Sequence, residues 1–287
     1  MKTHRLGSLA IDPQLLAQDI AVFETLPHST AYSDYLCNGP WLSCALWAKG
    51  GAIKDGLIEK LPERAPGAWT AAGLQLPALR ELIEGAVCHE ALTSVRLAMI
   101  MPGSVIIPHR DLLELSAPVH RFHVPLRTDN ESLFAEGDAV YRMRHGELWA
   151  LDASDEHSVI CNSAVPRIHL ILDFPDIALA EMMRVPVRPA EGIPSDALVE
   201  RPPLKPTEHA ALLGLADVVT LANLRTVIEL VTRQLYNRAV PVSYVWDTLC
   251  VIADKAPDRA AARRLLELNR YYCLDRTSGR VPDLVTA

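Results

Sequence analysis

A long central stretch of this chain consists of short segments rich in β-forming residues and separated by turns. It runs from Ser94 to Phe174 and includes SVRLAMIM, SVIIP, HRFHVPL, AVYRM, ELWALDA, HSVICN and RIHLILDF. Several short strands at regular spacing indicate an antiparallel sandwich or barrel, and not a parallel sheet of alternating strands and helices. We therefore expect a β core over roughly residues 94–175.

Helical patterns flank this β core on both sides. On its N-terminal side, Asp12-Pro13 opens one amphipathic stretch and Pro77 opens another. Beyond the core, residues 185–206 hold six of the chain's 21 prolines, which predicts a linker or wrapping arm. Residues 207–280 then show amphipathic helical patterns that are typical of a bundle.

These patterns divide the chain into three parts. We expect a β domain with N-terminal helices over residues 1–184, a proline-rich linker over 185–206 and a helical domain over 207–287. A chain of 287 residues, 49% of them hydrophobic, is long enough for one large core with a smaller satellite domain. The predicted fold class is therefore α+β.

Composition and charge narrow the class of partner. The formal net charge of −7 is spread along the chain without a Lys/Arg block, so the basic footprint of a nucleic-acid binder is missing and a small-molecule partner is favoured. The N-terminus lacks the apolar core of a signal peptide, and no apolar run approaches the roughly 18 residues that span a bilayer. We expect a soluble, cytoplasmic protein without a membrane partner. Its six cysteines form no C-x-x-C pair, which favours reduced, buried thiols.

The stretch PHRDLLELS, Pro108 to Ser116, allows two interpretations. His-Arg-Asp opens the catalytic loop of protein kinases, whereas His-x-Asp also opens a mononuclear iron site. A kinase would need an Asn at a fixed distance after the Asp, a D-F-G motif and a Gly-rich loop. The chain has Ser116 at the first position, Asp-Phe-Pro in place of D-F-G and no G-x-G-x-x-G. The kinase interpretation therefore fails.

The spacing of the residues supports the iron interpretation. In an extended strand, side chains two positions apart share a face, so His109 and Asp111 point the same way and Arg110 points away. A facial triad for Fe(II) needs a third ligand from a later strand and leaves positions open for O2 and a chelating cosubstrate. His157, which opens HSVICN, can supply that ligand. A chance match or a buried His-Asp pair is the alternative explanation.

Arg167 adds a second element to the pattern. The cosubstrate 2-oxoglutarate would chelate iron through its keto acid and leave its other carboxylate buried, which requires a charged, bidentate partner such as Arg. We expect the next antiparallel strand after HSVICN to bring Arg167 back beside the metal. His169 shares its face and is either a further donor to the site or a satisfied core histidine.

Arg96 and Arg121 lie inside apolar strands, where an unpaired buried charge would be costly. Each arginine either pairs with an acidic side chain or holds a substrate carboxylate. His123 shares a face with Arg121 and is also either a donor to the site or a core residue. His120 lies on the opposite face and is expected at the surface.

With these residues in place, the chain resembles the bacterial free-L-proline cis-hydroxylases, the cis-4 and type II cis-3 enzymes of the Fe(II)/2-oxoglutarate-dependent dioxygenase superfamily. The resemblance covers nearly the whole chain. It rests on RLGSLAIDPQLLAQDI, YSDY with the following Trp41, VIIPHRD with LEL, GELWALDA with HS, PRIHLILD and RYYCLDRTSG. It implies a double-stranded β-helix, the jelly-roll or cupin-like fold, flanked by helices and followed by a helical C-terminal domain.

The resemblance also implies roles for individual residues. It assigns iron binding to His109, Asp111 and His157, 2-oxoglutarate binding to Arg167, and binding of the substrate carboxylate to Arg96 and Arg121. Trp149 falls at a matched position, where a pocket wall and a core residue both remain open.

Two positions depart from the family pattern. Leu112 follows H-R-D where an aromatic residue is usual, and Met99 stands where a second arginine is common. The loss of an aromatic wall would widen the pocket, so L-pipecolate and an acyclic amino acid such as L-lysine stay open beside L-proline. A lysine side chain would need an acidic partner, for which the candidates are Glu114, Asp129 and Glu136.

The sequence therefore predicts an Fe(II)/2-oxoglutarate-dependent hydroxylase of a free amino acid, which uses O2 and forms a hydroxyamino acid, succinate and CO2. Two other functions stay open: the same chemistry on a tethered amino acid, and a non-catalytic β-barrel that binds a metal or ligand. The C-terminal helices carry no chemical motif, and we expect them either to buttress the β core or to form a homodimer contact.

Overall fold

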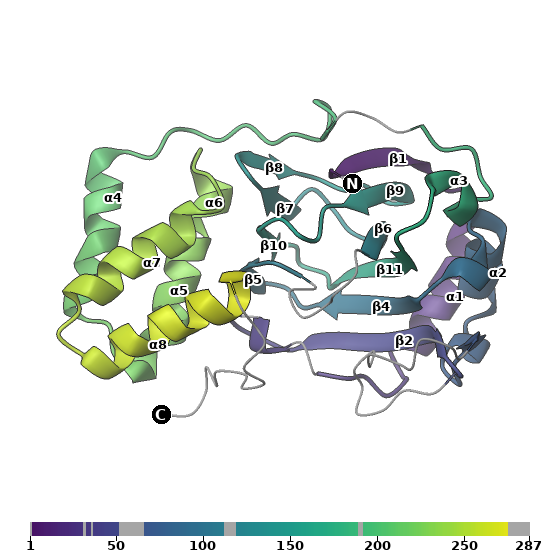
Figure 1. Ribbon diagram of the computed structural model, residues 1–287, viewed down its shortest axis with the longest axis horizontal. Coiled ribbons are helices and arrows are strands. Elements are labelled where there is room, and N and C mark those ends of the chain that lie inside the picture. The colour runs from purple at the N-terminus through teal and green to yellow at the C-terminus, as the bar shows by residue number, and fades with distance from the viewer. Residues whose placement is uncertain are drawn as a thin grey trace.

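The computed structural model describes residues 2–30, 33–35, 37–51, 66–111, 119–188 and 192–274. Its centre is a β barrel with helices at both ends (Figure 1). The barrel strands are β4 (Ser94–Ile100), β5 (Val105–His109), β6 (Val119–Arg127), β7 (Ser132–Glu136), β8 (Ala139–Tyr141), β9 (Glu147–Leu151), β10 (His157–Cys161) and β11 (Arg167–Pro175). Three further strands are β1 (His4–Ser8), β2 (Trp41–Lys49) and β3 (Gly67–Trp69).

The strands form two sheets, and the chain winds between them. The larger sheet has the order β1-β9-β6-β11-β4-β2-β3, and the smaller sheet has the order β5-β10-β7-β8. The neighbouring strands pair antiparallel. From β4 to β11 the chain crosses between the sheets at almost every step, which is the winding of a double-stranded β-helix. The predicted jelly-roll fold is confirmed.

The two faces of the larger sheet differ in chemistry. Leu97, Phe122 and Leu170 belong to an apolar cluster on its outer face. Because successive side chains along a strand point to opposite faces, Arg96 and His169, which lie next to these residues, face the barrel interior. These strands are largely apolar, and their charged and imidazole side chains point into the barrel interior.

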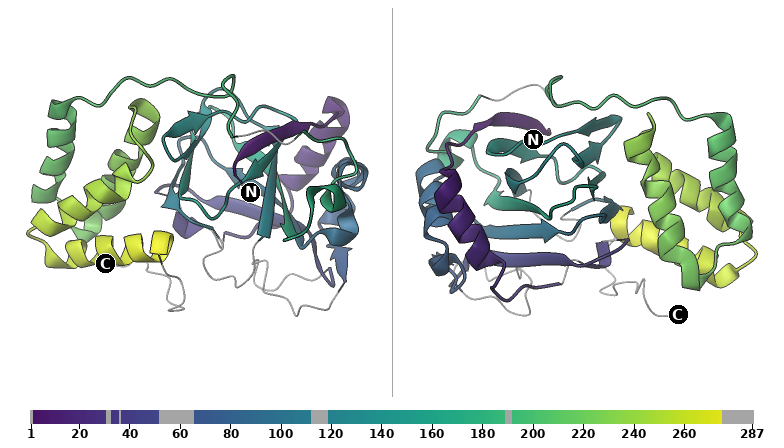
Figure 2. Two further views of the ribbon diagram at one scale, coloured as in Figure 1. Left: turned by 45° about the horizontal axis from the view of Figure 1, so that its top comes forward. Right: turned by 180° about the vertical axis from the view of Figure 1, so that it is seen from behind.

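The N-terminal helices cover the outer face of the larger sheet. Helix α1 (Pro13–Phe23) begins after Asp12, whose side chain accepts hydrogen bonds from the first-turn N–H groups, and helix α2 (Pro77–Ala86) begins with a proline. Leu16 of α1 and Ile83 of α2 belong to the same cluster as the sheet residues. Figure 2 shows α1 and α2 at the end of the barrel opposite the C-terminal helices. Both predicted helices are confirmed.

Beyond β11 and the short helix α3 (Leu179–Met182), residues 192–205 follow the barrel edge without a regular helix or strand. Leu198 forms a β bridge with Tyr141 of β8, and the N–H of Val199 donates to the carbonyl oxygen of Val140 at 2.8 Å. These residues lead to the C-terminal helices (Figure 1), and the linker bounds of 185–206 stay a prediction.

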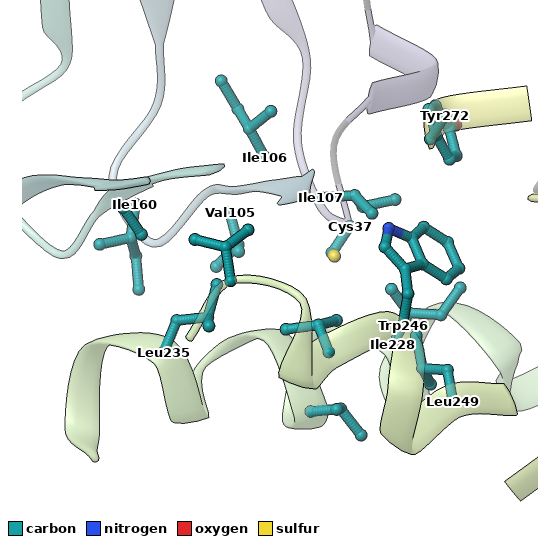
Figure 3. Close-up of a cluster of buried hydrophobic side chains, with 14 of the residues drawn as sticks. Cys37, Val105, Ile106, Ile107, Ile160, Ile228, Leu235, Trp246, Leu249 and Tyr272 are labelled. Atoms are coloured by element: carbon teal, nitrogen blue, oxygen red, sulfur yellow. The ribbon is translucent and has the colours of Figure 1, made fainter. Parts of the chain in front are cut away.

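The C-terminal bundle consists of helices that pack against the smaller sheet. They are α4 (Pro206–Leu213), α5 (Leu224–Thr232), α6 (Gln234–Asn237), α7 (Tyr244–Lys255), α8 (Arg259–Asn269) and the π-helical turn η6 (Arg270–Leu274). Val105, Ile107 and Ile160 of the sheet share one buried cluster with Ile228 and Leu249 of the bundle (Figure 3). The bundle therefore buttresses the β core, whereas the homodimer contact stays a prediction, as do the domain boundaries.

Two further predictions concern the whole chain. All six cysteines are free thiols, and four of them are buried. Within the residues that the structure describes, no helix combines the length and the hydropathy needed to cross a bilayer.

Candidate metal centre

Three side chains from two paired strands converge at one end of the barrel. His109 ends β5 and His157 begins β10, and the two residues are partners in the antiparallel ladder. Asp111 lies just after β5, in a bend. Its Oδ1 is 3.3 Å from Nε2 of His109, and its Oδ2 is 3.6 Å from Nε2 of His157. The three candidate ligand atoms lie within 4.8 Å of one another.

The hydrogen bonds of both histidines leave a lone pair for a metal. Nδ1 of His109 lies 2.8 Å from the carbonyl oxygen of Ile107, and Nδ1 of His157 lies 2.9 Å from that of Asp155. A carbonyl oxygen only accepts, so each Nδ1 carries a proton, and Nε2, on the side of Asp111, is the ring atom that can bind a metal. Two such nitrogens and a carboxylate oxygen are the donor set of a 2-His-1-carboxylate iron site. The residues fit the metal.

Electrostatics keep this set in its metal-binding form. Burial, the largest single influence, raises the pKa of Asp111, but the charge of Arg121, the hydrogen bond with His109 and the proximity of His157 together outweigh it and hold the pKa well below its ordinary value. Burial, followed by the proximity of His109, lowers the pKa of His157. The carboxyl group is therefore ionised, and the imidazole of His157 is neutral, as metal coordination requires.

Arg96 and Arg121 meet a buried carboxylate beside the metal ligands. Arg121 donates from Nε to Oδ1 of Asp173 at 2.7 Å and from Nη2 to Oδ2 at 3.0 Å, and its Nη1 donates to Asp111. Arg96 donates to Oδ2 of Asp173 at 3.2 Å, and Ser94 donates to the same atom at 3.1 Å. Both arginines thus have the acidic partner that was one of the two predicted alternatives.

Deeper in the barrel, Arg167 lies among rings. Its guanidinium carbon is 4.6 Å from the centre of the Phe134 ring, and its Nη2 donates to Nδ1 of His169 at 3.0 Å. His169 Nε2 and both ring nitrogens of His123 have no hydrogen-bond partner among the described residues. Burial, followed by the charge of Arg167, lowers the pKa of each histidine well below its ordinary value, so both are neutral.

Arg167 reaches the interior by a route other than the one predicted. Strand β10 belongs to the smaller sheet and β11 to the larger one, so Arg167 does not return on a strand paired with that of His157. The expectation of a neighbouring antiparallel strand was wrong. The two side chains still share the barrel interior, because the sheets face each other across it.

Comparisons with known proteins agree with this site. Residues 14–176 match the aspartyl/asparaginyl beta-hydroxylase family, and residues 181–280 match the C-terminal domain of L-proline 3-hydroxylase. An L-proline cis-4-hydroxylase of Rhizobium meliloti (strain 1021) is 30% identical over 98% of this chain and 99% of its own. The chain belongs to the family of the L-proline cis-hydroxylases. An L-proline cis-3-hydroxylase 2 of Streptomyces sp. is 30% identical over 90% of each chain, so the resemblance seen in the sequence is confirmed.

Other predicted residues of this L-proline cis-hydroxylase family member lie in different places. Trp149 is fully buried and is the ladder partner of His123, its Nε1 donates to Glu147 at 2.9 Å, and its ring stacks on Tyr141. Its role as a pocket wall or a core residue stays a prediction. Met99 belongs to the outer apolar cluster and does not line the interior. The departure at Met99 therefore does not reshape the pocket.

The remaining candidates divide between the surface, the barrel and the undescribed part of the chain. His120 lies on the outer face and contacts Asp176 at 3.0 Å. Glu136 pairs with His157 in the β7–β10 ladder, whereas Asp129 is exposed. Leu112 and Glu114 lie outside the described residues.

Sequence reasoning missed several residues that support the site. Asp173, which holds both arginines, shares a face of β11 with Arg167 and His169, so the two-residue alternation could have located it. The bundle residues Tyr236 and Trp246, which contact the strands of the metal ligands, carry no signal in the sequence, because their role arises only from long-range packing.

Proposed function

We propose that the protein is an Fe(II)- and 2-oxoglutarate-dependent hydroxylase of a free amino acid, with L-proline or the ring analogue L-pipecolate as substrate. His109, Asp111 and His157 would hold the iron, and Arg167 would hold the distal carboxylate of 2-oxoglutarate. The products would be the cis-hydroxylated amino acid, succinate and CO2.

The observation that carries this proposal is the buried charge of Arg167. Its side chain lies in the same interior as the triad, and among the described residues no carboxylate lies within ion-pair distance of it. A buried cation without a counterion is costly, and burial lowers its pKa. A carboxylate of the cosubstrate would remove this cost.

The position of Arg167 suits a diacid that reaches the metal. Phe134, under the guanidinium, lies two residues along β7 from Glu136, the ladder partner of His157. Two residues of a strand span about 7 Å, a length comparable to that of a five-carbon diacid. One end of 2-oxoglutarate can thus lie at Arg167 while its keto acid lies at the triad.

The substrate carboxylate is assigned to Arg96 and Arg121, beside the triad. Two arginine charges there face the carboxylates of Asp173 and Asp111. When Asp111 serves as a metal ligand, part of its charge is taken by the metal, and the arginines are left with positive charge for an anionic ligand. A free amino acid supplies that anion, whereas an amino acid tethered through its carboxyl group does not.

In the reaction, the bound iron and 2-oxoglutarate supply the activation of O2 and the transfer of one oxygen atom to a C–H bond. The protein's own residues orient the substrate. Arg96 and Arg121 fix its carboxylate, and Asp173 fixes both guanidinium groups, so that one C–H bond is held toward the metal. The rings of His123 and His169 contact each other at 5.6 Å, and because burial lowers the pKa of both they add no positive charge beside Arg167.

One feature favours a ring amino acid over lysine. Glu136, the described acid nearest the metal ligands in the strand ladder, already accepts hydrogen bonds from Thr3 at 2.5 Å and Tyr141 at 3.4 Å. Burial raises the pKa of Glu136 and so disfavours the ionised form that a lysine ammonium would need.

The test is succinate release by the Fe(II)-loaded protein with 2-oxoglutarate and a panel of free L-amino acids that includes L-pipecolate. We expect turnover on proline or pipecolate, none with His157→Ala, and full turnover with His120→Ala, a histidine on the outer face. Turnover on lysine alone would support the metal site but show that the substrate is lysine and not a ring amino acid. No succinate with any amino acid would contradict the proposal.

A further inference from the structure

The strand that carries His109 lies at the edge of its sheet. In the order β5-β10-β7-β8, β5 has a strand neighbour on one side only, so its other side presents backbone groups that need partners. At the first residue of β5 the partner comes from the N-terminal part of the chain, because the carbonyl oxygen of Val105 accepts a hydrogen bond from the N–H of Cys37 at 2.9 Å.

At the metal end of β5, the partners come from the C-terminal bundle. Trp246 of α7 donates from Nε1 to the carbonyl oxygen of Pro108 at 2.8 Å. The N–H of Arg110 donates to the carbonyl oxygen of Tyr272, in η6, at 2.9 Å. The residues directly before and after His109 are thus both bonded to the bundle, which replaces a missing strand neighbour.

Aromatic packing extends this support to the ligand ring itself. The ring of Tyr35 lies edge-on to that of His109 at 4.7 Å between centroids, and Tyr272 lies 5.2 Å from Tyr35. Tyr272 in turn stacks on Trp246 at 6.1 Å. Trp246 extends from the bundle toward Ile107 of β5 (Figure 3).

The bundle also contacts the second ligand strand. Ser158, directly after His157, donates its hydroxyl to the carbonyl oxygen of Ile106 at 2.6 Å and accepts a hydrogen bond from the hydroxyl of Tyr236 at 2.8 Å. Tyr236 belongs to α6 and is buried. One bundle therefore holds both strands whose ends carry the histidine ligands.

We propose that the C-terminal bundle is a working part of the metal site, in which Trp246 and Tyr236 act as positioning residues for His109 and His157. The inference rests on the triad being the metal site of the proposed function, and it adds a role for the bundle. Partners of ligand-bearing groups typically change metal affinity by about 10- to 100-fold when they are removed. The distance between the two imidazoles would depend on these contacts.

The experiment measures Co(II) binding to the full-length apoprotein by its visible absorption, in the absence of 2-oxoglutarate and amino acid. Trp246→Phe and Tyr236→Phe each remove one hydrogen-bond donor. We expect each to raise the Kd for Co(II) by about tenfold, with an altered d–d spectrum, and excess metal to restore succinate release.

Two controls separate positioning from general destabilisation. Leu249→Ala removes buried volume on the same helix as Trp246, and Tyr244→Phe removes a hydroxyl that contacts His209 at 2.9 Å away from β5. Both should leave the Kd for Co(II) unchanged, and Leu249→Ala should lower the melting temperature of the apoprotein.

Each outcome decides the inference. Unchanged Co(II) affinity and spectrum in both Trp246→Phe and Tyr236→Phe would overturn it while leaving the proposed function intact. A loss of affinity as large in Leu249→Ala would also overturn it. Failure of the unsubstituted protein to bind Co(II) would refute the metal site and the proposed function together.

Discussion

The two ends of the barrel interior both hold buried arginines, but only one end supplies them with acidic partners among the described residues. Near the metal ligands, Arg96 and Arg121 bind Asp173 in a network in which the charges are matched by the protein. At the other end, Arg167 touches only rings and an imidazole nitrogen among the described residues. In the metal-free protein the charges of the first arrangement are matched without a ligand, whereas Arg167 has no counterion among the described residues, so substitutions at the two ends should affect the stability of that form in opposite directions.

The largest effect is expected for Asp173→Asn. Removing one partner from a buried ion pair leaves the other charge uncompensated and costs about 3–5 kcal/mol of unfolding free energy. Urea denaturation of the metal-free protein measures this cost, and the KM for the amino acid should rise because both guanidinium groups lose their orientation.

Asp196→Asn is the matched control. Asp196 also binds two arginines, Arg5 and Arg144, but at the surface, where water screens the charges. Its loss should leave the urea midpoint nearly unchanged. Equal midpoints for the two variants would show that the buried network contributes nothing beyond a surface pair.

These residues also show how far sequence reasoning reaches. The two-residue alternation placed His109 and Asp111 together and put Arg121 with His123 on one face, because such spacing is local. It did not find the sheet of Arg167, since β10 and β11 are consecutive in the chain but lie in facing sheets.

The contacts between the bundle and the barrel could not be predicted from the sequence, for a second reason. The bundle was predicted from its amphipathic helices, yet the same apolar faces suit a barrel contact and a dimer contact equally well. Only the folded chain shows Trp246 donating to Pro108, a contact between residues that are far apart in sequence. Local periodicity fixes elements and faces, whereas partners across the core depend on the whole packing.

A smaller effect, opposite in sign for stability, is expected for Arg167→Met. Losing a charged hydrogen bond to 2-oxoglutarate, worth about 1.5–3 kcal/mol, should weaken its binding by roughly 10- to 100-fold. The unfolding free energy of the ligand-free protein should stay equal or rise, because the substitution removes a buried charge that lacks a counterion.

Titration of 2-oxoglutarate into the Co(II)-loaded protein measures the first quantity, and urea denaturation measures the second. Arg127→Met is the control, because Arg127 lies on the neighbouring strand and pairs with Glu24 at 2.7 Å outside the barrel. A loss of stability in Arg167→Met similar to that in Asp173→Asn would mean that Arg167 has a protein counterion, and the contrast between the two ends would disappear.

The smallest effect is expected for His123→Phe, between the two ends. The phenyl ring can keep the contacts with Phe134 and His169, at 5.8 and 5.6 Å, while two nitrogens without partners are removed. A hydrogen bond from His123 to the amino-acid substrate would be lost in this variant, so the KM for the amino acid should rise about fivefold, the equivalent of roughly 1 kcal/mol. The KM for 2-oxoglutarate should stay unchanged. The unfolding free energy should not fall, in contrast to His145→Phe, which removes a bond to the carbonyl oxygen of Leu126. A rise in the KM for 2-oxoglutarate instead would show that His123 contacts the cosubstrate near Arg167. No change in either KM would show that His123 is a core residue.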